Sequence, residues 1–310
     1  YRNQLSKSYV NDSKVTNELG QEAYNRMTKE VRASHILILV DEGASPEDTL
    51  KAFNKIKDIK NRLNAGEDFV KVAQQFSEDP SVKENNGDLG YFSAFRMVYP
   101  FENAAFNTNV GEVSKPFRTR FGYHLVKVVD KRDNRGEVTV AHIMIVKPST
   151  PDAQLEAKAK QTIDDIYQKI QQGEGFESLA NQFSEDKSSA SKGGVLQRFG
   201  SGQLSSEEFE NVAFSLQNKN DISKPFQSQF GWHIVKLIDK HPVLSLTDMK
   251  NELEEKVRKD ERSLLITNSL AKKLRAKYPQ TKDSKVLASV KKIITDDFYS
   301  QTWETPLNLK

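Results

Sequence analysis

The sequence contains no cysteine among its 310 residues, and this absence excludes several kinds of chemistry. Without a thiol the chain forms no disulfide, no thiolate metal site and no cysteine nucleophile. It also lacks a run of 18 consecutive apolar residues, which a membrane-spanning helix needs, so we expect no transmembrane segment. An excess of one charge is missing too, because 46 Lys and Arg against 43 Asp and Glu leave a net charge of +3. Proteins that neutralise nucleic-acid phosphates usually have a larger basic excess, so we expect no nucleic-acid partner.

The chain begins at Tyr1 rather than at Met, and no basic segment followed by an apolar one comes after it. We therefore expect a processed form or an excised fragment. Charged residues make up 29% and hydrophobic residues 36% of the chain, a composition typical of a polar globular protein. Its length allows about two or three domains.

An internal repeat is the most informative feature of the sequence. Five segments recur in the same order, with an offset that grows only from 107 to 109 residues, which chance does not explain. A short polar link, Arg132–Glu137, separates the copies and predicts a hinge. The paired segments are Val31–Ile38 with Val138–Ile145, Phe76–Asp79 with Phe183–Asp186, Pro100–Phe106 with Glu208–Phe214, Ser114–Phe117 with Ser223–Phe226, and Phe121–His124 with Phe230–His233.

Each repeat predicts the element order β-α-α-β-α-β-β, an α+β domain with a small, mostly antiparallel sheet. A β-rich run opens the repeat, and Ser45-Pro46 gives a helix start that Thr150-Pro151 matches in the second copy. The predicted domains are residues 31–131 and 138–240. They are flanked by helical arms, residues 1–30 and 243–310.

The arms carry apolar stripes at helical spacing and have no obvious core of their own. Before the first repeat the stripe runs from Val15 to Met27. After the second repeat, Ser245–Tyr278 predicts one long helix and Val286–Ile294 a shorter one.

Four of the five histidines fall at equivalent places on the opening and closing strands of the two repeats. If those strands are neighbours, two imidazoles meet inside each domain, and an Asp after the second helix adds an acceptor. Two interpretations stay open on spacing alone: a hydrogen-bonded histidine pair in the core, or a dyad beneath a ligand pocket. No H-x-H or H-x3-H spacing exists, so we expect no metal site. The residues are His35, His124 and Asp79 in the first repeat and His142, His233 and Asp186 in the second.

Six motifs, in their order and spacing, resemble those of the parvulin-type peptidyl-prolyl isomerases. Both repeats carry them. The tandem pair with helical flanks further resembles the SurA class of periplasmic chaperones, which escort unfolded outer-membrane proteins. In the first repeat the motifs are Ser34–Leu37, Phe76–Asp79, Gly87–Phe92, Pro100–Phe106, Gly111–Pro116 and Phe121–His124.

The resemblance implies catalysis of rotation about X–Pro bonds. Such a bond isomerises over a barrier of roughly 18–20 kcal/mol, because twisting destroys amide resonance. No bond breaks and no electron is transferred, so we expect no cofactor. An apolar pocket that grips the proline ring, with hydrogen bonds that favour the twisted geometry, binds the transition state better than either ground state.

The resemblance also implies which residues form the two sites. The histidines and aspartates would form the polar floor in a non-covalent role, because the reaction has no leaving group. We prefer a pocket role for Phe101 and core packing for Phe106. The implied prolyl pockets are Leu89, Phe92, Met97, Phe101 and Phe121 in the first repeat, and Leu196, Phe199, Leu204, Phe209 and Phe230 in the second.

The second repeat departs from the pattern at several places, which leads us to expect that the first repeat is the better isomerase. Its Met97 neighbourhood gains one residue, so Leu204 is the substitute for the methionine. The other changes are Asp88 to Val195, Gly90 to Gln197 and Pro100 to Glu208.

A phosphorylated substrate is not expected. Phospho-specific parvulins carry a basic cluster just after the first strand, whereas this chain has the acidic pair Asp41-Glu42 there and only Lys147 in the second repeat. A Ser-His-Asp hydrolase is not expected either, because no G-x-S-x-G elbow is present.

Two hypotheses of function follow. The first is a tandem prolyl isomerase and chaperone whose partners are unfolded or proline-containing polypeptides, outer-membrane proteins among them by resemblance. The alternative is a holdase that uses parvulin domains as peptide-binding modules with little catalysis. The resemblance places the protein in the periplasm or cell envelope. The sequence leaves the oligomeric state open.

Overall fold

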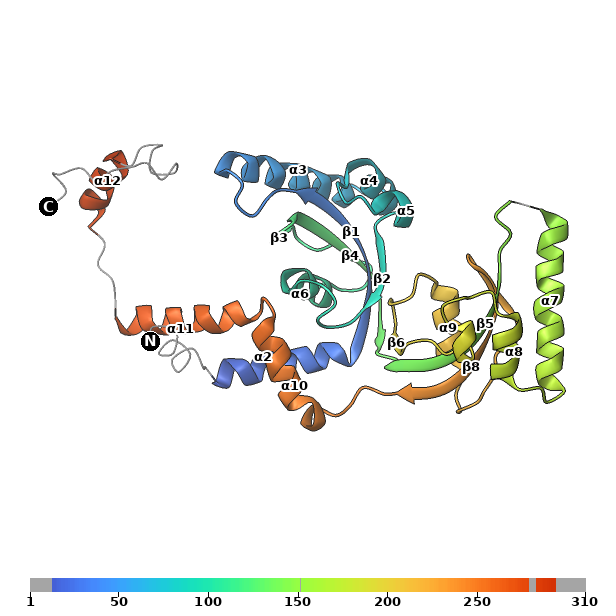
Figure 1. Ribbon diagram of the computed structural model, residues 1–310. Helices are drawn as coiled ribbons and strands as arrows, with labels where there is room; N and C mark the ends of the chain where they lie inside the picture. Colours follow the sequence, from blue (N-terminus) through green and yellow to red (C-terminus); the bar gives the residue numbers. More distant parts are fainter. Residues whose placement is uncertain (1–12, 151, 279–282, 294–310) are drawn as a thin grey trace. The chain divides into compact units, whose positions relative to one another are not determined.

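The computed structural model describes residues 13–150, 152–278 and 283–293 (Figure 1). The chain divides into two units, one of residues 17–262 and one that combines residues 1–16 with 263–310. Both repeats lie in the first unit. Pro151, part of the predicted helix start in the second repeat, lies outside the described residues.

The two repeats fold into equivalent domains with the predicted order of elements and one additional short helix each. The first contains β1 (Lys29–Leu39), α3 (Pro46–Asn64), α4 (Phe69–Phe76), α5 (Val82–Asn85), β2 (Asp88–Phe92), α6 (Tyr99–Asn107), β3 (Phe117–Thr119) and β4 (Gly122–Asp133). The second contains β5 (Glu137–Val146), α7 (Ala153–Gln171), α8 (Phe176–Phe183), the 3-10 helix η1 (Ala190–Lys192), β6 (Phe199–Gly200), α9 (Glu207–Ser215), β7 (Phe226–Ser228) and β8 (Gly231–His241).

Each domain is built on a four-stranded sheet in which all the pairings are antiparallel. The strand order is β2-β1-β4-β3 in the first domain and β6-β5-β8-β7 in the second, so the opening and closing strands are neighbours at the centre. In the first sheet His35 lies opposite Val126, and Leu37 lies opposite His124. The predicted α+β fold with a mostly antiparallel sheet is confirmed.

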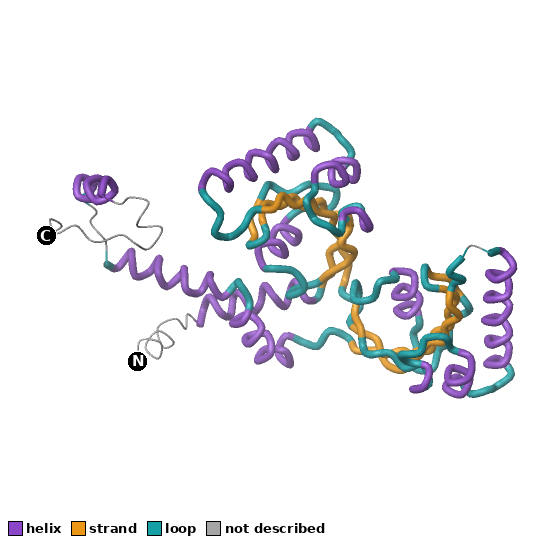
Figure 2. The backbone as a smooth tube through the Cα atoms, turned by 45° about the horizontal axis from the view of Figure 1, so that its top comes forward, coloured by secondary structure: helices purple, strands orange, loops and turns teal. Residues whose placement is uncertain are grey.

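The sheet of the first domain buries one apolar cluster on each face. Ile36, Ile38 and Leu125 face α3 and α4, because strand side chains alternate between faces. Val31 and Val126 point to the opposite face and pack with Phe101 of α6. Figures 1 and 2 show α3 and α4 on one side of this sheet and α6 on the other. The histidines belong to the α6 side.

The link between the domains is shorter than predicted. Strand β4 ends at Asp133 and β5 begins at Glu137, which leaves three connecting residues. Asn134 donates from Nδ2 to the Met27 carbonyl at 2.7 Å, and its Oδ1 accepts from Gly136 N at 2.8 Å. Arg135 donates from Nε to Ser201 Oγ at 3.0 Å. These hydrogen bonds hold the segment that the sequence predicts to be a hinge.

The described parts of the arms are mainly helical, but the predicted single helix over Ser245–Tyr278 is wrong. Helix α10 (Leu246–Lys259) ends before Asp260, whose backbone is extended, and α11 (Ser263–Lys277) begins three residues later. The Asp260 side chain accepts from Arg262 N at 2.9 Å, a local hydrogen bond that competes with helix continuation. Helix α2 (Ser13–Met27) precedes the first domain, and α12 (Ser284–Ile293) confirms the shorter predicted helix, whose last residue, Ile294, lies outside the described residues.

The apolar stripes differ in burial within the described parts of the arms. Leu19 and Ala23 of α2 are buried, and so are Leu253 and Val257 of α10. Leu264 and Leu274, which the single-helix prediction placed on the same stripe, are exposed on α11. Among the described residues no helix combines the length and the apolar character needed to cross a membrane.

Candidate active site

The sheet register brings two imidazoles together in each domain. His35 of β1 and His124 of β4 are diagonal partners, because each lies opposite the residue two positions along the strand from the other. Their ring centroids are 5.9 Å apart and the rings are nearly parallel, at 20°. His142 and His233 repeat this arrangement at 5.9 Å and 15°. The sequence spacing therefore places each pair correctly.

The two rings of a pair use different partners. His124 Nε2 lies 2.7 Å from Thr119 Oγ1, within hydrogen-bond distance. His35 Nε2 lies 2.7 Å from Asp79 Oδ2, a contact that is close but not aligned as a hydrogen bond. The Nδ1 atoms of both rings are buried without a hydrogen-bond partner. The interpretation of a histidine pair hydrogen-bonded to itself is therefore wrong.

The second domain repeats these contacts with one better-aligned hydrogen bond. His142 Nε2 is hydrogen-bonded to Asp186 Oδ2 at 2.7 Å, and His233 Nε2 to Ser228 Oγ at 2.7 Å. Both Nδ1 atoms are again buried without a partner. A ring nitrogen that is buried and unpaired costs free energy, so this geometry is a reason to look for a functional role.

The aspartates are held as carboxylates by neighbouring serines. Burial alone would raise the pKa of Asp79, but hydrogen bonds from Ser81 N and Oγ, both 2.9 Å, and the contact with His35 outweigh it and lower the pKa. The pKa of Asp186 is lowered further: its burial is outweighed by hydrogen bonds from Ser189 Oγ, His142 and Ser188. Both aspartates are ionised at neutral pH.

The imidazoles are held neutral, chiefly because burial disfavours the charged form. Burial, with a smaller contribution from the neighbouring histidine, lowers the pKa of His124 to about 3 and that of His233 to about 4. Burial also lowers the pKa of His35 and of His142, although the nearby aspartate opposes the shift. Each site therefore combines one ionised carboxylate with two neutral rings at neutral pH.

Phe101 forms the aromatic centre of the first site. Its ring makes edge contacts with His35 at 5.7 Å and with His124 at 5.6 Å. Phe92 lies behind it, at 6.1 Å. Leu89 and Met97 are half-buried against the same cluster. Four of the five predicted pocket residues thus lie together on the histidine face of the sheet.

Phe121, the fifth residue, is 48% exposed and belongs to the turn between β3 and β4. Its counterpart Phe230 is 46% exposed. Neither ring lies in the buried floor. Because Phe230 lines the cavity of the second domain, we place these two rings at the rim of the sites.

The second site contains an open cavity of about 250 Å³. Phe209 lies at its base and contacts His142 at 5.4 Å and His233 at 5.3 Å. Phe199 does not line the cavity; it is buried behind Phe209, at 6.3 Å. The predicted residues that line the cavity are His142, Asp186, Leu196, Leu204, Phe209, Phe230 and His233.

The sequence analysis missed several residues that shape the sites. Phe117 stacks on His124 at 5.4 Å and 15°, and Phe226 stacks on His233 at 5.4 Å and 26°. Thr119 and Ser228 supply the hydroxyls that meet His124 and His233, which we call the inner histidines. Phe117 and Phe226 end a matched segment of the repeat, so the signal was present in the sequence, but only the hairpin pairing shows that they face the histidines.

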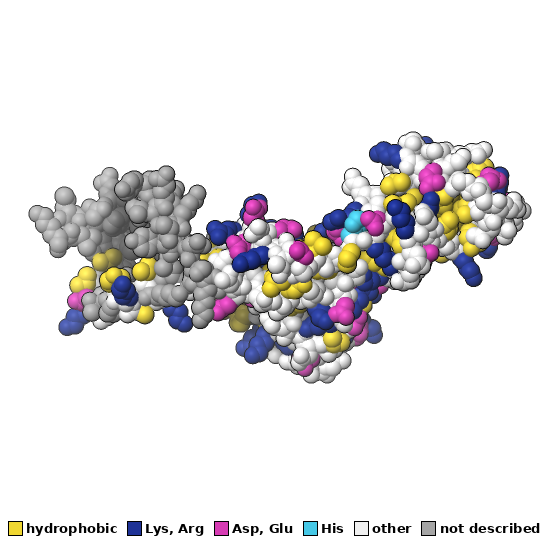
Figure 3. Space-filling view, turned by 90° about the horizontal axis from the view of Figure 1, so that it is seen from below, with side chains coloured by type: hydrophobic (Ala, Val, Ile, Leu, Met, Phe, Trp, Pro, Cys, Tyr) yellow, Lys and Arg dark blue, Asp and Glu magenta, His cyan; other side chains and the backbone are white. Residues whose placement is uncertain are grey.

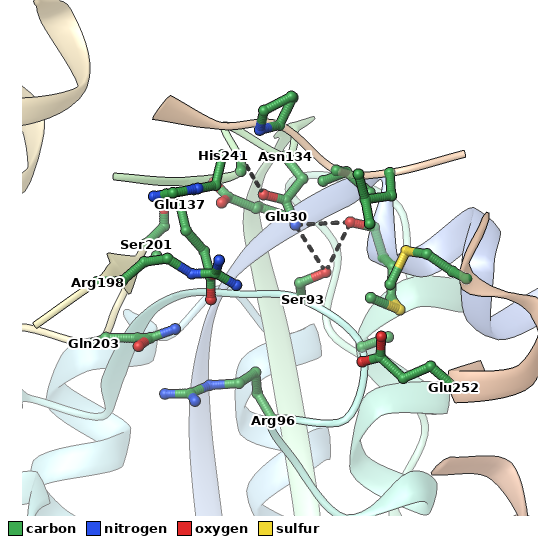
Figure 4. Close-up of a pocket in the computed structure, with 18 of the residues that line it drawn as sticks. Glu30, Ser93, Arg96, Asn134, Glu137, Arg198, Ser201, Gln203, His241 and Glu252 are labelled. Atoms are coloured by element: carbon green, nitrogen blue, oxygen red, sulfur yellow. Dashed lines mark hydrogen bonds and ion pairs between the residues drawn. The ribbon is translucent and has the colours of Figure 1, made fainter. Parts of the chain in front are cut away.

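A larger cavity of about 410 Å³ lies between the domains (Figure 4). Ser93 and Asn134 meet at one wall through a hydrogen bond of 3.4 Å. Charged side chains such as Arg96 and Glu252 line it, and it has no Phe, Tyr or Trp. It therefore lacks the aromatic floor found in the two sites. Within the described residues no group of three or more His, Asp or Glu is arranged to hold a metal ion.

The comparisons with known proteins agree with this geometry. Residues 19–132 and 142–239 each match a family described as the PPIC-type PPIASE domain. Chaperone SurA of Pseudomonas putida is 33% identical over 74% of this chain and 54% of its own length. Chaperone SurA of Pseudomonas aeruginosa is 34% identical over 74% of this chain and 55% of its own length. The chain thus spans about half the length of the curated relatives that it matches.

A solved structure of the peptidylprolyl isomerase PrsA from Bacillus anthracis is 31% identical and covers 47% of this chain and 62% of its own. Its TM-score is 0.30, which is too low to carry a functional argument. The two domain matches lie on the two repeats, and each contains a complete histidine–aspartate–phenylalanine cluster. The chain belongs to the PPIC-type, or parvulin, peptidyl-prolyl isomerase family, carries two of its domains in tandem, and is homologous to Chaperone SurA.

Proposed function

We propose that this protein is a peptidyl-prolyl cis-trans isomerase and chaperone that acts on unfolded or extended polypeptides of the cell envelope. One observation carries the proposal: the same cluster of a phenylalanine floor, two neutral imidazoles and one carboxylate is built twice. The periplasmic or envelope location and the outer-membrane clients are proposed from the resemblance to the SurA class.

The geometry suits stabilisation of a twisted amide. A planar amide places additional partial negative charge on its oxygen, and twisting reduces that charge and leaves a lone pair on nitrogen. A proline ring packed on Phe101 or Phe209 would place the rotating bond beside the carboxylate and the neutral rings. The ionised aspartate repels the charged carbonyl of the planar state more than that of the twisted state. Lowering the barrier by about 4 kcal/mol gives roughly a thousandfold acceleration.

No covalent step is part of this mechanism. The neutral imidazoles position the aspartate and the phenylalanine and do not themselves bond the substrate, because their ring nitrogens are buried or already have partners. Because His124 and His233 have pKa values of about 3 and about 4, no proton has to move at neutral pH. We expect the isomerisation rate to be flat between about pH 6 and 8.

Which domain isomerises faster is a finer question. The sequence favours the first domain, because the second departs from the family pattern at Val195, Gln197 and Glu208. The open cavity in the second domain favours the second. The first domain stays our prediction, and the experiment below decides it.

The test uses the full chain and a proline-containing tetrapeptide whose cis-to-trans exchange is followed directly. Phe101→Ala and His35→Ala disable the first site, and Phe209→Ala and His142→Ala disable the second. We expect each pair of substitutions to lower the contribution of its own domain to kcat/KM by tenfold or more. A variant that combines substitutions in both domains should not accelerate the exchange. An unmodified chain that does not accelerate exchange would contradict the isomerase proposal. Unchanged rates in all four variants would show that the site is assigned wrongly.

A second candidate function, holding of unfolded clients, is favoured by exposed apolar side chains on the C-terminal helices. Leu264 and Leu274 of α11 and Val286 and Leu287 of α12 are exposed. On the face shown in Figure 3 the apolar side chains form several separate patches among charged ones. We expect the chain to suppress aggregation of a client that contains no proline. Failure with that client, together with retained isomerisation, would leave catalysis as the function.

A further inference from the structure

A buried glutamate in each domain holds the loop that forms one wall of the prolyl site. In the second domain Glu210 of α9 is only 3% exposed. Its carboxylate accepts hydrogen bonds from the backbone N–H groups of Gly202 at 2.9 Å, Gln203 at 3.0 Å and Leu204 at 2.9 Å. Leu204 lines the cavity. The carboxylate thus fixes the cavity wall from behind.

The equivalent residue in the first domain is Glu102 of α6, which is fully buried. Its Oε2 accepts from Phe95 N at 2.8 Å, two residues before Met97 on the wall of the first site. Phe95 has a φ of 64°, a left-handed conformation that a phenylalanine rarely adopts. Such strain persists only where the surroundings hold it. The bond to Glu102 is one of the constraints that hold this loop.

Each glutamate also faces an arginine that comes from just before the first strand of its own domain. Arg26 donates from Nη1 to Glu102 Oε1 at 2.9 Å and from Nη2 to Asn103 at 2.7 Å. In the second domain Arg135 donates to Asn211 at 3.0 Å and lies 3.9 Å from Glu210. These arginines are counterparts, and both guanidinium groups lie over a phenylalanine of the same helix, Phe106 or Phe214.

The first domain has one further arginine, and it comes from the other end of the chain. Arg262 is fully buried and donates from Nη2 to Glu102 Oε2 at 2.8 Å. Its guanidinium lies 4.2 Å from the Phe95 ring and 4.7 Å from the Tyr99 ring. Asp260 accepts from its Nε at 2.8 Å. Helix α10 with Asp260–Arg262, which we call the C-terminal clamp, therefore contacts the strained loop and its glutamate together.

We propose that Glu102 and Glu210 are positioning residues for the Met97 and Leu204 walls, and that the C-terminal clamp controls the first prolyl site but not the second. The clamp acts through Arg262, which shares Glu102 Oε2 with the backbone of Phe95. The description of the walls as prolyl rests on the proposed function; the coupling between clamp and wall does not.

The physical reason is the cost of an unpaired buried charge. Without Arg262 the Glu102 carboxylate is under-compensated in a site that excludes water, so it and the loop that it binds have to rearrange. The Phe95 ring loses the nearer of its two cations in the same event and keeps only Lys256, at 5.8 Å. Any change that weakens the clamp therefore favours another position of Met97, and by linkage a substrate against Met97 favours one state of the clamp.

The four methionines of the chain allow a direct test. Met97 reports the wall of the first site, Met144 lines the cavity of the second, and Met249 is buried on α10. We would record methyl NMR spectra of the full chain with labelled methionine. Arg262→Ala should shift or broaden the Met97 and Met249 methyl signals and leave Met144 unchanged. Glu210→Ala should have the reverse effect, on Met144 and not on Met97.

Arg262→Lys provides a milder variant in case Arg262→Ala does not fold. It keeps the charge but loses the forked hydrogen bonds and the stacking, so we expect a smaller Met97 shift of the same direction. An unmoved Met97 signal in the folded Arg262 variants overturns the proposal. A shift of Met144 as large as that of Met97 also overturns it, because the effect is then not specific to the first domain.

Activity gives the second readout. In a Phe209→Ala background only the first site remains active, and there Arg262→Lys should lower kcat/KM severalfold. In a Phe101→Ala background only the second site remains active, and there Arg262→Lys should change kcat/KM by less than twofold. An equal loss in both backgrounds contradicts the proposal. If neither background accelerates isomerisation, the proposed function fails, while the methyl shifts still decide the coupling.

Discussion

The two parvulin domains share an inner cluster and differ in what surrounds it. The histidine pairs are separated by the same 5.9 Å, and the central phenylalanine contacts both rings in each domain. The edge strand next to the site is different: β2 has five residues, whereas β6 has two. The cluster is therefore set by the two central strands, which both repeats keep, and not by the edge strand.

The shorter edge strand follows from particular side chains. In the first domain Arg32 of β1 donates to Asp88 of β2 at 2.7 Å, and Asp88 also accepts from Gly90 N at 2.9 Å. The second repeat has Thr139 and Val195 at the corresponding places, so this ion pair is missing. Only an isolated bridge joins Ala141 to Val195 there. Substitution at the edge changes the wall of the site while the floor is preserved.

The largest effect that tests this comparison is acid destabilisation of both domains. The unfolded chain binds a proton at each imidazole near pH 6.5, whereas folded His124 and His233 do so only near their pKa values of about 3 and about 4. Below pH 6.5 the unfolded state therefore holds more protons, and stability falls as the pH drops towards 4. We expect a loss of about 3 kcal/mol per domain by pH 4.

Urea unfolding between pH 4 and 8 measures this loss, and NMR titration of the histidine ring protons identifies its source. The aspartates act in the same direction at lower pH, because their lowered pKa values make the folded state resist protonation below about pH 4. Inner rings that titrate between pH 6 and 7 in the folded chain would contradict the buried, neutral pairs.

The next effect concerns the glycine that begins each closing strand. Gly122 has a φ of 151°, and a Cβ there would lie 2.1 Å from the Ile38 carbonyl oxygen. Gly231 has a φ of 145°, and a Cβ there would lie 2.1 Å from the Ile145 carbonyl oxygen. We expect Gly122→Ala and Gly231→Ala to cost about 3 kcal/mol each, because strain and a backbone clash add. Thermal unfolding of both variants measures it.

The matched controls are Gly66 and Gly173, which also have positive φ values but open space at the Cβ position. Gly66→Ala and Gly173→Ala should cost only about 1 kcal/mol, from strain alone. If one domain tolerates the change at its closing strand and the other does not, the two hairpins are not equivalent, and the two domains differ in their central strands as well as at the edge.

The smallest effect concerns the hydroxyl beneath each inner histidine. Thr119 Oγ1 meets His124 and accepts from Phe121 N at 3.1 Å, and Ser228 Oγ does the same for His233 and Phe230 N at 3.1 Å. Thr119→Val and Ser228→Ala leave a histidine with both nitrogens unpartnered, so we expect a loss of about 1–2 kcal/mol.

The exchanged variants Thr119→Ser and Ser228→Thr keep the hydroxyl and should cost less than about 0.5 kcal/mol. Urea midpoints give the stability, and the nitrogen chemical shifts of the rings report the tautomer. Equal stability of Thr119→Val and Thr119→Ser would show that the hydroxyl is not needed.

Part of this organisation could be predicted because the pattern is local or repeated. Alternation along the strands placed His35 and His124 on one face, and the offset between repeats identified the counterparts of the predicted site residues. The Ser45 cap, which accepts from Asp48 N at 3.1 Å, follows directly from neighbouring residues. The prediction failed where the chain departs from its local preference: nothing in the apolar spacing of residues 245–278 shows that the helix breaks at Asp260.

The sequence by itself determined the two repeats, most of their order of elements and the pairing of the histidines, because periodicity and caps depend on neighbouring residues and the repeat is visible when the two halves of the chain are compared. Only the tertiary structure decided which nitrogen of each histidine has a partner, that Phe121 lies at the rim, and that Arg262 reaches Glu102 across 160 residues of chain. Those outcomes depend on which side chains share a buried volume, and packing in three dimensions sets that after the strands have paired.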